Sequence, residues 1–144
     1  MNLAIGADHA GVEAKDRLSD FLKGLGHRVE DLGTNGKDSV DYPRFAEAVA
    51  RKVAGGGAER GVLVCGSGLG MAIAANKVPG IRAVPVVDQE AARLSRRHND
   101  ANVLCLGARL TPYPAMEGIA KAWLETAFEG GRHAERVAQI GRIR

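Results

Sequence analysis

Aromatic residues are scarce in this chain. Three Phe, two Tyr and one Trp make up 4% of its 144 residues, so a core must be built mainly from aliphatic side chains. The arginines are spread along the chain and are not interleaved with aromatic residues, which argues against nucleic acid as a partner.

Cysteine and long apolar runs are also rare. The two cysteines, Cys65 and Cys105, share no metal-ligand spacing and form no disulfide framework, so we expect no metal site and a reducing cytoplasm. No apolar run approaches the length that crosses a bilayer, and no signal peptide precedes the first predicted strand. We therefore expect no membrane association.

The remaining composition is that of an ordinary globular protein. Hydrophobic residues make up 45% and charged residues 26% of the chain. Its length suits one domain spanning residues 1–144 with a substantial core. The net charge of +3 is mildly basic and is compatible with a small anionic ligand.

Short apolar runs alternate with longer amphipathic ones along the whole chain. The runs predict strands at residues 2–5, 28–32, 62–65, 82–87 and 103–106, and helices at 12–25, 43–54, 71–75, 89–97 and 114–128, with weak helical spacing in the Arg-rich tail from residue 132. Apolar strands without alternation are buried on both faces, and intervening helices imply parallel pairing. The fold class is therefore α/β: a three-layer α/β/α, Rossmann-like sandwich with a five-stranded parallel sheet and a C-terminal helical tail.

The most informative segment is the third predicted strand and the glycine loop that follows it, Gly61-Val-Leu-Val-Cys65-Gly-Ser-Gly-Leu-Gly70-Met-Ala72. A strand that ends in a glycine loop and opens a helix presents several unpaired backbone N–H groups, which suit an anion. Here the anion site would adjoin the thiol of Cys65, as in a proton-transfer or nucleophilic site. The alternative is a glycine turn that only connects strand to helix. The loop lacks the Lys-Ser or Lys-Thr of a P-loop and the third glycine of a dinucleotide-binding motif.

Other polar residues follow the strands or close the last helices. Ligands bind at the carboxyl ends of parallel strands, where Asp8, His9 and Arg109 are expected. Asp8 has the alternative role of a helix N-cap, and Cys65 that of a buried core thiol. Cys105 lies inside the apolar run Val-Leu-Cys-Leu and is expected to be a core thiol.

The C-terminal third of the chain adds more candidates. His98 and Asn99 close the fourth predicted helix, where His98 has the alternative role of a helix cap. Arg132 and Arg136 are four residues apart, so one helical turn would align them for a phosphate, although a solvated basic tail remains the alternative.

A series of short motifs covers nearly the whole chain in order: Gly6-Ala-Asp-His-Ala-Gly11, Asp31-Leu-Gly33, Asp41-Tyr-Pro43, Cys65-Gly-Ser-Gly-Leu-Gly70, Ala74-Ala-Asn-Lys77, Gly80-Ile-Arg-Ala83, Leu94-Ser-Arg-Arg-His-Asn-Asp100, Gly107-Ala-Arg109 and Gly130-Gly-Arg-His133. In these motifs the chain resembles the family of ribose-5-phosphate isomerase B and the galactose-6-phosphate and allose-6-phosphate isomerases. Ser67 stands where the family often has Thr, and it keeps the hydroxyl. Some members lack the loop cysteine, which this chain has.

The resemblance implies an aldose–ketose isomerase of the pentose phosphate pathway that interconverts ribose 5-phosphate and ribulose 5-phosphate through an enediolate, without a metal or organic cofactor. The implied catalytic residues are Cys65 as the base, Ser67 as a hydrogen-bond donor and His98 for ring opening. The implied substrate-binding residues are Asp8, His9, Gly66, Ser67, Gly68, Leu69, Gly70, Asn99, Arg109, Arg132 and Arg136. Family members are dimers or tetramers, so we expect a homo-oligomer, as a homodimer or larger, with sites at the subunit interface.

Two other functions stay open at this point. One is an isomerase for a hexose 6-phosphate such as allose or galactose 6-phosphate. The other is a non-catalytic sugar-phosphate-binding subunit, which would need the arginines but would have no use for a base such as Cys65.

Overall fold

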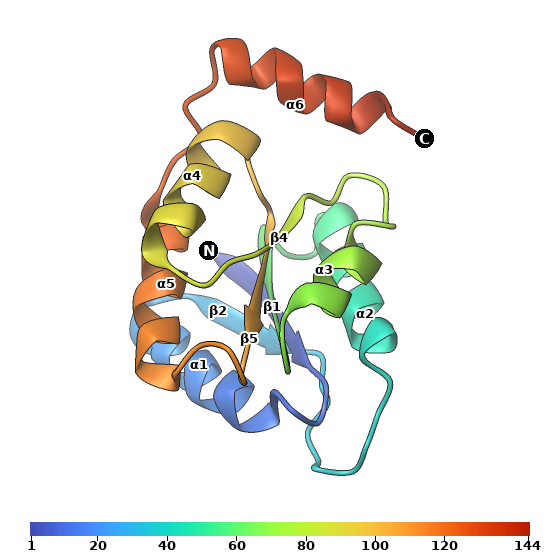
Figure 1. The fold of residues 1–144 in the computed structure, drawn as a ribbon, viewed down its shortest axis with the longest axis vertical. Helices are drawn as coiled ribbons and strands as arrows, with labels where there is room; N and C mark the ends of the chain where they lie inside the picture. Colours follow the sequence, from blue (N-terminus) through green and yellow to red (C-terminus); the bar gives the residue numbers. More distant parts are fainter.

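The computed structural model describes residues 1–144, and their strands form one central sheet (Figure 1). The five strands are β1 (Asn2–Ala7), β2 (Arg28–Asp31), β3 (Arg60–Cys65), β4 (Ala83–Pro85) and β5 (Val103–Gly107). They are all parallel, in the order β2-β1-β3-β5-β4. The predicted α/β class and five-stranded parallel sheet are therefore confirmed.

Six helices accompany the sheet: α1 (Val12–Gly24), α2 (Tyr42–Ala54), α3 (Leu69–Ala75), α4 (Gln89–Asn99), α5 (Tyr113–Glu125) and α6 (Arg132–Arg142). Helices α1, α4 and α5 cover one face of the sheet, and α2 and α3 cover the other (Figure 1). Each face has its own aliphatic core, of 17 buried residues on the α1–α5 side and 16 on the α2–α3 side. None of the helices is both long and apolar enough to span a membrane.

Local sequence explains where several helices begin. Pro43 lies in the first turn of α2, where its missing N–H costs no hydrogen bond. The carboxylate of Asp88 accepts a hydrogen bond from the Ala91 N–H at 2.8 Å and caps α4. Gly68 precedes α3 with a φ of 79°, a conformation that glycine adopts without strain. Helix α3 consequently begins at Leu69, two residues earlier than predicted.

Some predictions at the edges of the fold are wrong. Strand β2 is largely exposed rather than buried on both faces, because it lies at the sheet edge and carries charged residues. Strand β4 is shorter than predicted and ends at Pro85, which has no N–H to continue the ladder. Helix α1 ends at Gly24 rather than at the predicted residue 25, because Gly26 turns the chain with a φ of 96°, and Leu25 is 41% exposed.

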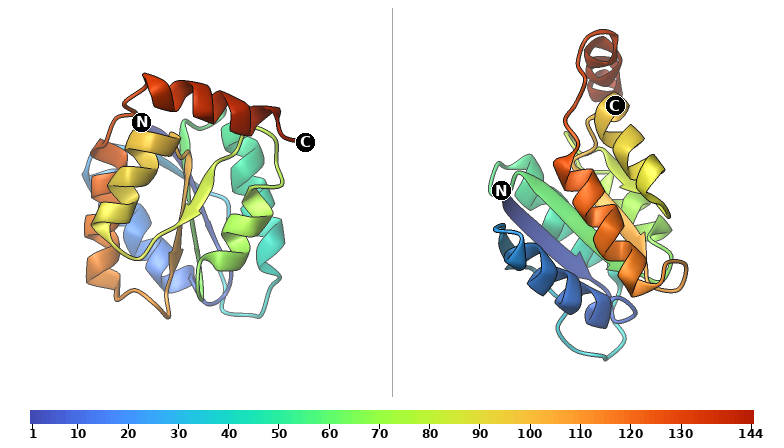
Figure 2. Two further views of the ribbon diagram at one scale, coloured as in Figure 1. Left: turned by 45° about the horizontal axis from the view of Figure 1, so that its top comes forward. Right: turned by 90° about the vertical axis from the view of Figure 1, so that its left-hand side faces the viewer.

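The C-terminal segment departs most from its weak sequence pattern. Helix α5 ends at Glu125 rather than near residue 128, because Thr126 adopts extended backbone. After a short connection, α6 forms a regular helix that has no buried residue. It lies across one end of the molecule beside the end of α4 and stands away from the sheet (Figure 2).

Candidate active site

A pocket of about 380 Å³ opens at the carboxyl ends of β1, β3 and β5. The order β2-β1-β3-β5-β4 reverses direction between β1 and β3, and ligands of open parallel sheets bind at such a reversal. The pocket is lined by Asp8, Tyr42, Cys65, Gly66, Ser67, Gly70, Arg109 and Leu110. The structure thus brings together most of the candidates predicted for the first, third and fifth strands.

The glycine loop (residues 66–70) wraps around the thiol of Cys65. The N–H of Gly68 donates to the Cys65 Sγ at 3.1 Å, and the N–H of Leu69 donates to the Ser67 Oγ at 3.2 Å. The N–H groups of Gly66, Ser67 and Gly70 have no hydrogen-bond acceptor within the protein. One loop amide therefore stabilises negative charge on sulfur, and three others remain free for a ligand.

Close packing against the end of β5 holds the loop in place. A Cβ on Gly107 would lie 2.6 Å from the carbonyl carbon and oxygen of Ser67, so only glycine allows this approach. The Ala108 N–H donates to the Cys65 carbonyl at 2.8 Å, and the Arg109 N–H donates to the Gly66 carbonyl at 2.9 Å. These bonds place the Arg109 guanidinium against Gly66 at the pocket wall.

Asp8 and His9 form the turn after β1. Asp8 Oδ1 accepts the Ala10 N–H at 3.0 Å in a local turn, so Asp8 is not the N-cap of α1, which is Gly11. His9 Nδ1 accepts the Val40 N–H at 3.1 Å. In the neutral tautomer that this bond selects, the His9 Nε2 carries the proton and is a donor.

Tyr42 lines the pocket, although it was not among the predicted catalytic or substrate-binding residues. Its ring lies over Gly70, where a Cβ would approach the ring carbons to 2.6 Å. Tyr42 is the first residue of α2 and does not follow a strand. Only its place in the Asp41-Tyr-Pro43 motif could therefore have indicated that it lines the pocket.

The other cysteine is a core residue. Cys105 lies in the middle of β5 with no exposed surface, and burial raises the pKa of its thiol far above the usual range. The interpretation of Cys105 as a buried structural thiol is confirmed.

The remaining candidates, His98, Asn99, Arg132 and Arg136, lie at the opposite end of the sheet. Helix α4 runs from the carboxyl edge of the sheet back to its amino edge. At the amino edge, the Gly61 N–H at the start of β3 donates to the carbonyl of Asn102, just after the end of α4, at 2.9 Å. A six-residue strand such as β3 spans about 16 Å at about 3.3 Å per residue. One chain alone therefore does not bring His98 to Cys65.

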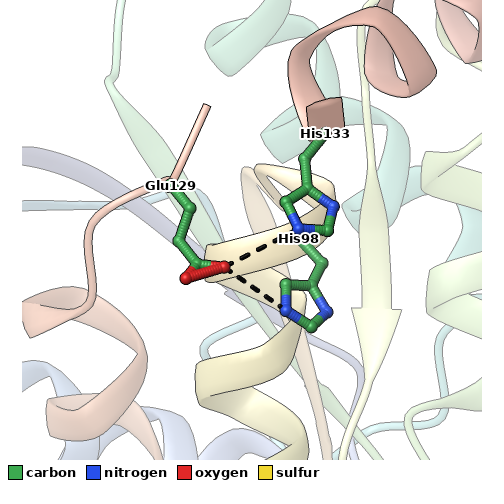
Figure 3. Close-up of side chains that lie close together, drawn as sticks. All are labelled: His98, Glu129 and His133. Carbon is green, nitrogen blue, oxygen red and sulfur yellow. Dashed lines mark ion pairs between the residues drawn. The ribbon is translucent and has the colours of Figure 1, made fainter. Parts of the chain in front are cut away.

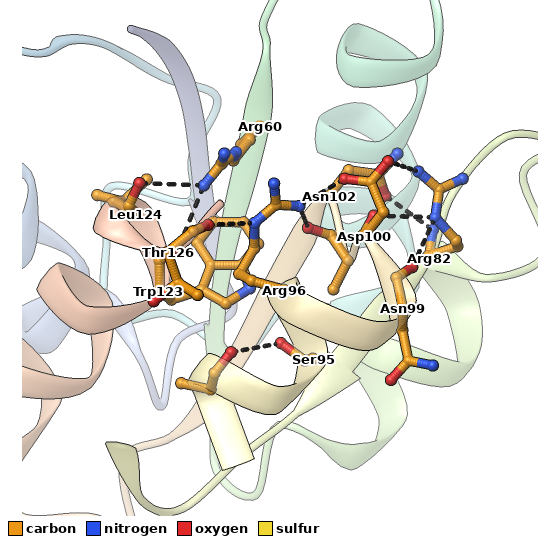
Figure 4. A network of polar contacts seen from close by, with 12 residues as sticks. Arg60, Arg82, Ser95, Arg96, Asn99, Asp100, Asn102, Trp123, Leu124 and Thr126 are labelled. Carbon is orange, nitrogen blue, oxygen red and sulfur yellow. Dashed lines mark hydrogen bonds and ion pairs between the residues drawn. The ribbon is translucent and has the colours of Figure 1, made fainter. Parts of the chain in front are cut away.

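A network of arginines fixes the end of α4 (Figure 4). Arg96 donates to Asp100 at 2.8 Å, to the Ala101 carbonyl at 2.7 Å and to the Thr126 carbonyl at 3.1 Å. Arg60 donates to the last carbonyls of α5, and burial, followed by the charge of Arg96, lowers its pKa to about 10. These bonds hold the α4 end, with His98 and Asn99, in a defined position.

His98 also contacts α6 and the segment before it (Figure 3). Its ring stacks on that of His133 with centroids 4.3 Å apart, and both imidazoles face the carboxylate of Glu129. Desolvation, and then the charges of His98 and Arg132, lower the pKa of His133 below its usual value. Sequence interpretation missed Glu129 and His133 as neighbours of His98, because their proximity depends on the path between α5 and α6.

Known proteins resemble this chain over nearly its whole length. The ribose/galactose isomerase family matches residues 3–140. The chain is 45% identical over 141 residues to ribose-5-phosphate isomerase B of Escherichia coli strain K12, covering 98% of this chain and 95% of the relative. Among solved structures, ribose-5-phosphate isomerase B of Clostridium thermocellum superposes with a TM-score of 0.97 at 50% identity, covering 98% and 95% of the two chains. The Mycoplasma genitalium enzyme, with bound ribulose 5-phosphate, superposes with a TM-score of 0.94 at 43% identity, covering 98% and 94%. The chain belongs to the ribose/galactose isomerase family.

Proposed function

We propose that the protein is a ribose-5-phosphate isomerase, which interconverts ribose 5-phosphate and ribulose 5-phosphate in the pentose phosphate pathway. The observation that carries the proposal is a thiol at the carboxyl edge of the sheet, Cys65, surrounded by the backbone amides of a glycine loop. Ribulose 5-phosphate bound to the Mycoplasma genitalium relative supports the choice of substrate.

Cys65 is the general base of the proposed reaction. As a thiolate it removes the C2 proton of the open-chain aldose and returns it to C1, while the hydroxyl proton on the C2 oxygen passes to the C1 oxygen, giving the ketose. The Gly68 N–H, 3.1 Å from the sulfur, stabilises the thiolate before the proton moves. Because enediolate chemistry moves only protons, the proposed mechanism uses no metal or organic cofactor.

The free loop amides stabilise the enediolate. The N–H groups of Gly66, Ser67 and Gly70 have no other acceptor, so they can bind the oxygen on which charge develops. The Ser67 Oγ already accepts a hydrogen bond from Leu69, which leaves its own O–H to donate to the substrate. Gly68 and Leu69 act indirectly, since their amides hold the thiol and the hydroxyl.

Charged and hydrogen-bonding side chains can bind the sugar hydroxyls and the phosphate of the substrate. Asp8 keeps Oδ2 for sugar hydroxyls, because Oδ1 accepts the Ala10 N–H. Arg109 and the Nε2–H of His9 provide donors for the phosphate.

A second copy of the chain supplies His98, Asn99, Arg132 and Arg136 in the proposed enzyme. These residues are remote from Cys65 within one chain, whereas α6 has no buried residue and leaves Ile140 and Ile143 46% and 77% exposed. Ile73 on α3 is 70% exposed. Apolar residues at such positions favour burial against another subunit, and we therefore propose a homodimer with two shared sites.

In this dimer the residues from the second copy have distinct roles. His98 opens the furanose ring by moving a proton between the ring oxygen and the anomeric hydroxyl, a task that suits imidazole near neutral pH. Asn99 contacts sugar hydroxyls, and Arg132 and Arg136, one turn apart on α6, bind the phosphate. We propose that the enzyme works in the cytoplasm, where free thiols stay reduced.

A coupled assay of ribose 5-phosphate consumption, in metal-free buffer, tests the proposal. Wild type and the matched control Cys105→Ala should both convert the substrate, whereas Cys65→Ala should convert it at least about 100-fold more slowly. Failure of the wild type to convert ribose 5-phosphate would contradict the proposed function.

A hexose-6-phosphate isomerase is the second candidate, because the family that matches also covers galactose isomerases. Tyr42 and Leu110 line the pocket that the longer sugar would have to enter. Higher kcat/KM for allose 6-phosphate or galactose 6-phosphate than for ribose 5-phosphate would favour this candidate. A non-catalytic sugar-phosphate-binding subunit would bind ribose 5-phosphate without turnover.

A further inference from the structure

Three potential metal ligands meet at the end of the molecule opposite the thiol. His98 comes from the last turn of α4, Glu129 from the segment between α5 and α6, and His133 from the first turn of α6 (Figure 3). One ligand atom from each lies within 4.8 Å of the other two. Glu129 and His133 are four residues apart, whereas His98 lies 31 residues before Glu129, so the fold brings His98 to the other two ligands.

Two of the three separations in the cluster are close to the edges of a zinc coordination tetrahedron. Glu129 Oε1 lies 3.4 Å from His98 Nε2 and 3.7 Å from His133 Nε2. Neither contact meets the geometry of a hydrogen bond, which would normally be about 2.7–3.2 Å long. Ligands about 2.0–2.1 Å from a tetrahedral zinc ion stand about 3.3–3.4 Å apart. The two measured edges are therefore near those of a site that surrounds one ion.

Backbone hydrogen bonds hold the three ligands together before any ion arrives. The Glu129 N–H donates to the Arg97 carbonyl at 3.1 Å, next to His98. Arg96 Nε donates to the Thr126 carbonyl at 3.1 Å and fixes the same connection closer to α5. The His133 N–H donates to the Gly130 carbonyl at 3.0 Å. Little backbone ordering is thus required for binding, which favours affinity.

We propose that His98, Glu129 and His133 form a binding site for Zn²⁺ or a similar transition-metal dication. Two imidazoles and one carboxylate are a known zinc ligand set, and the fourth position would be open to water. The rings are nearly parallel, at 11°, so they must rotate apart slightly for both nitrogens to meet one ion. The side chain of His98 is 41% exposed, which leaves room for this rotation. The positive charges of Arg132 and Arg136 on α6 oppose the binding of a cation and lower the affinity.

The site would make the enzyme sensitive to zinc. Binding of Zn²⁺ to His98 Nε2 holds the ring against Glu129 and removes it from proton transfer. This part of the inference rests on the proposed function, whereas the existence of the site does not. Zinc is then a reversible inhibitor that does not touch the thiol.

Direct binding tests the site independently of activity. Isothermal titration of the full-length protein with Zn²⁺ in phosphate-free buffer should show one ion per chain. Glu129→Gln and His133→Ala should each weaken binding at least about tenfold, while the matched control His27→Ala and the thiol variant Cys65→Ser should retain it. Circular dichroism should show that the variants are folded.

Several results would overturn the proposal. They are the absence of zinc binding to the wild type, binding that survives in both Glu129→Gln and His133→Ala, and binding that is lost in Cys65→Ser, which would place the ion at the thiol.

Activity separates the site from the proposed role of His98. Zinc should reduce wild-type turnover, and a chelator should restore it. The turnover of His133→Ala should be inhibited much less by zinc, relative to the rate of the same variant without zinc. If the same zinc concentration inhibited the wild type and His133→Ala equally, the link between this site and inhibition would be overturned. Zinc binding that leaves wild-type turnover intact would uphold the site and refute the role of His98.

Discussion

Replacing Gly107 with alanine tests how closely catalysis depends on the position of the glycine loop. The added methyl would lie 2.6 Å from the carbonyl carbon and oxygen of Ser67 and 2.8 Å from its Cα. These are backbone atoms, so no side-chain rotation can relieve the overlap. Ordinary van der Waals contact begins at 3.4 Å, and the loop must therefore move away from β5 by about 0.8 Å.

The size of this shift sets the expected effects. A displacement of about 1 Å in positioning groups costs about 100-fold in rate, and Ser67 and the free amides beside it belong to the proposed oxyanion site. We expect Gly107→Ala to lower kcat by about 100-fold. Overpacking at a buried site costs about 1–3 kcal/mol of unfolding free energy, so we expect the variant to fold.

Steady-state turnover of ribose 5-phosphate and denaturant unfolding measure the two effects. Gly24→Ala is the matched control, because nothing lies within 4 Å of its added methyl at the end of α1. Its activity should be unchanged. A folded Gly107→Ala protein with a kcat within about threefold of wild type would refute the argument that the loop position controls the rate.

The proposed roles of single residues give further predictions. Iodoacetamide should alkylate Cys65 much faster than Cys105, whose buried thiol has a raised pKa. Cys65→Ala should lower kcat by roughly 10²–10⁴-fold and abolish exchange of the C2 hydrogen of the substrate with deuterated water. Equal labelling of both thiols with activity retained, or near-normal C2 exchange in Cys65→Ala, would remove Cys65 from the mechanism. In His98→Ala, the rate of ribose 5-phosphate consumption should reach a plateau as enzyme is added, at the spontaneous rate of ring opening; a rate that stays proportional to enzyme would assign ring opening to another group. Arg132→Ala should mainly raise KM, through loss of a charged hydrogen bond of about 1.5–3 kcal/mol, and an unchanged KM would place Arg132 outside the phosphate site.

The interior of the fold was predictable because its signals are local. Apolar runs in β1, β3 and β5 and the helical spacing in α2 identified the buried elements. Errors arose where burial depends on position in the sheet. The run that forms β2 is strand-like in sequence, yet its exposure follows from having one neighbour only.

The candidate site was only half predictable for a similar reason. The rule that ligands bind at carboxyl ends of strands selected Asp8, Cys65 and Arg109, which do share a pocket. Tyr42 joins them from α2, and Glu129 reaches His98 through a connection between helices. Such contacts form between segments that are distant in sequence. The spacing of residues within one segment therefore does not predict them.

The distance between Cys65 and His98 within one chain has a genetic consequence. In the proposed homodimer, the two residues of a single polypeptide serve different pockets. A chain carrying Cys65→Ala and a chain carrying His98→Ala are each defective alone, but a mixed dimer of the two has one pocket that contains neither substitution. With random pairing, half of the dimers are mixed, and the mixture should regain about a quarter of the wild-type sites. Two damaged copies of the gene would then complement each other in one cell.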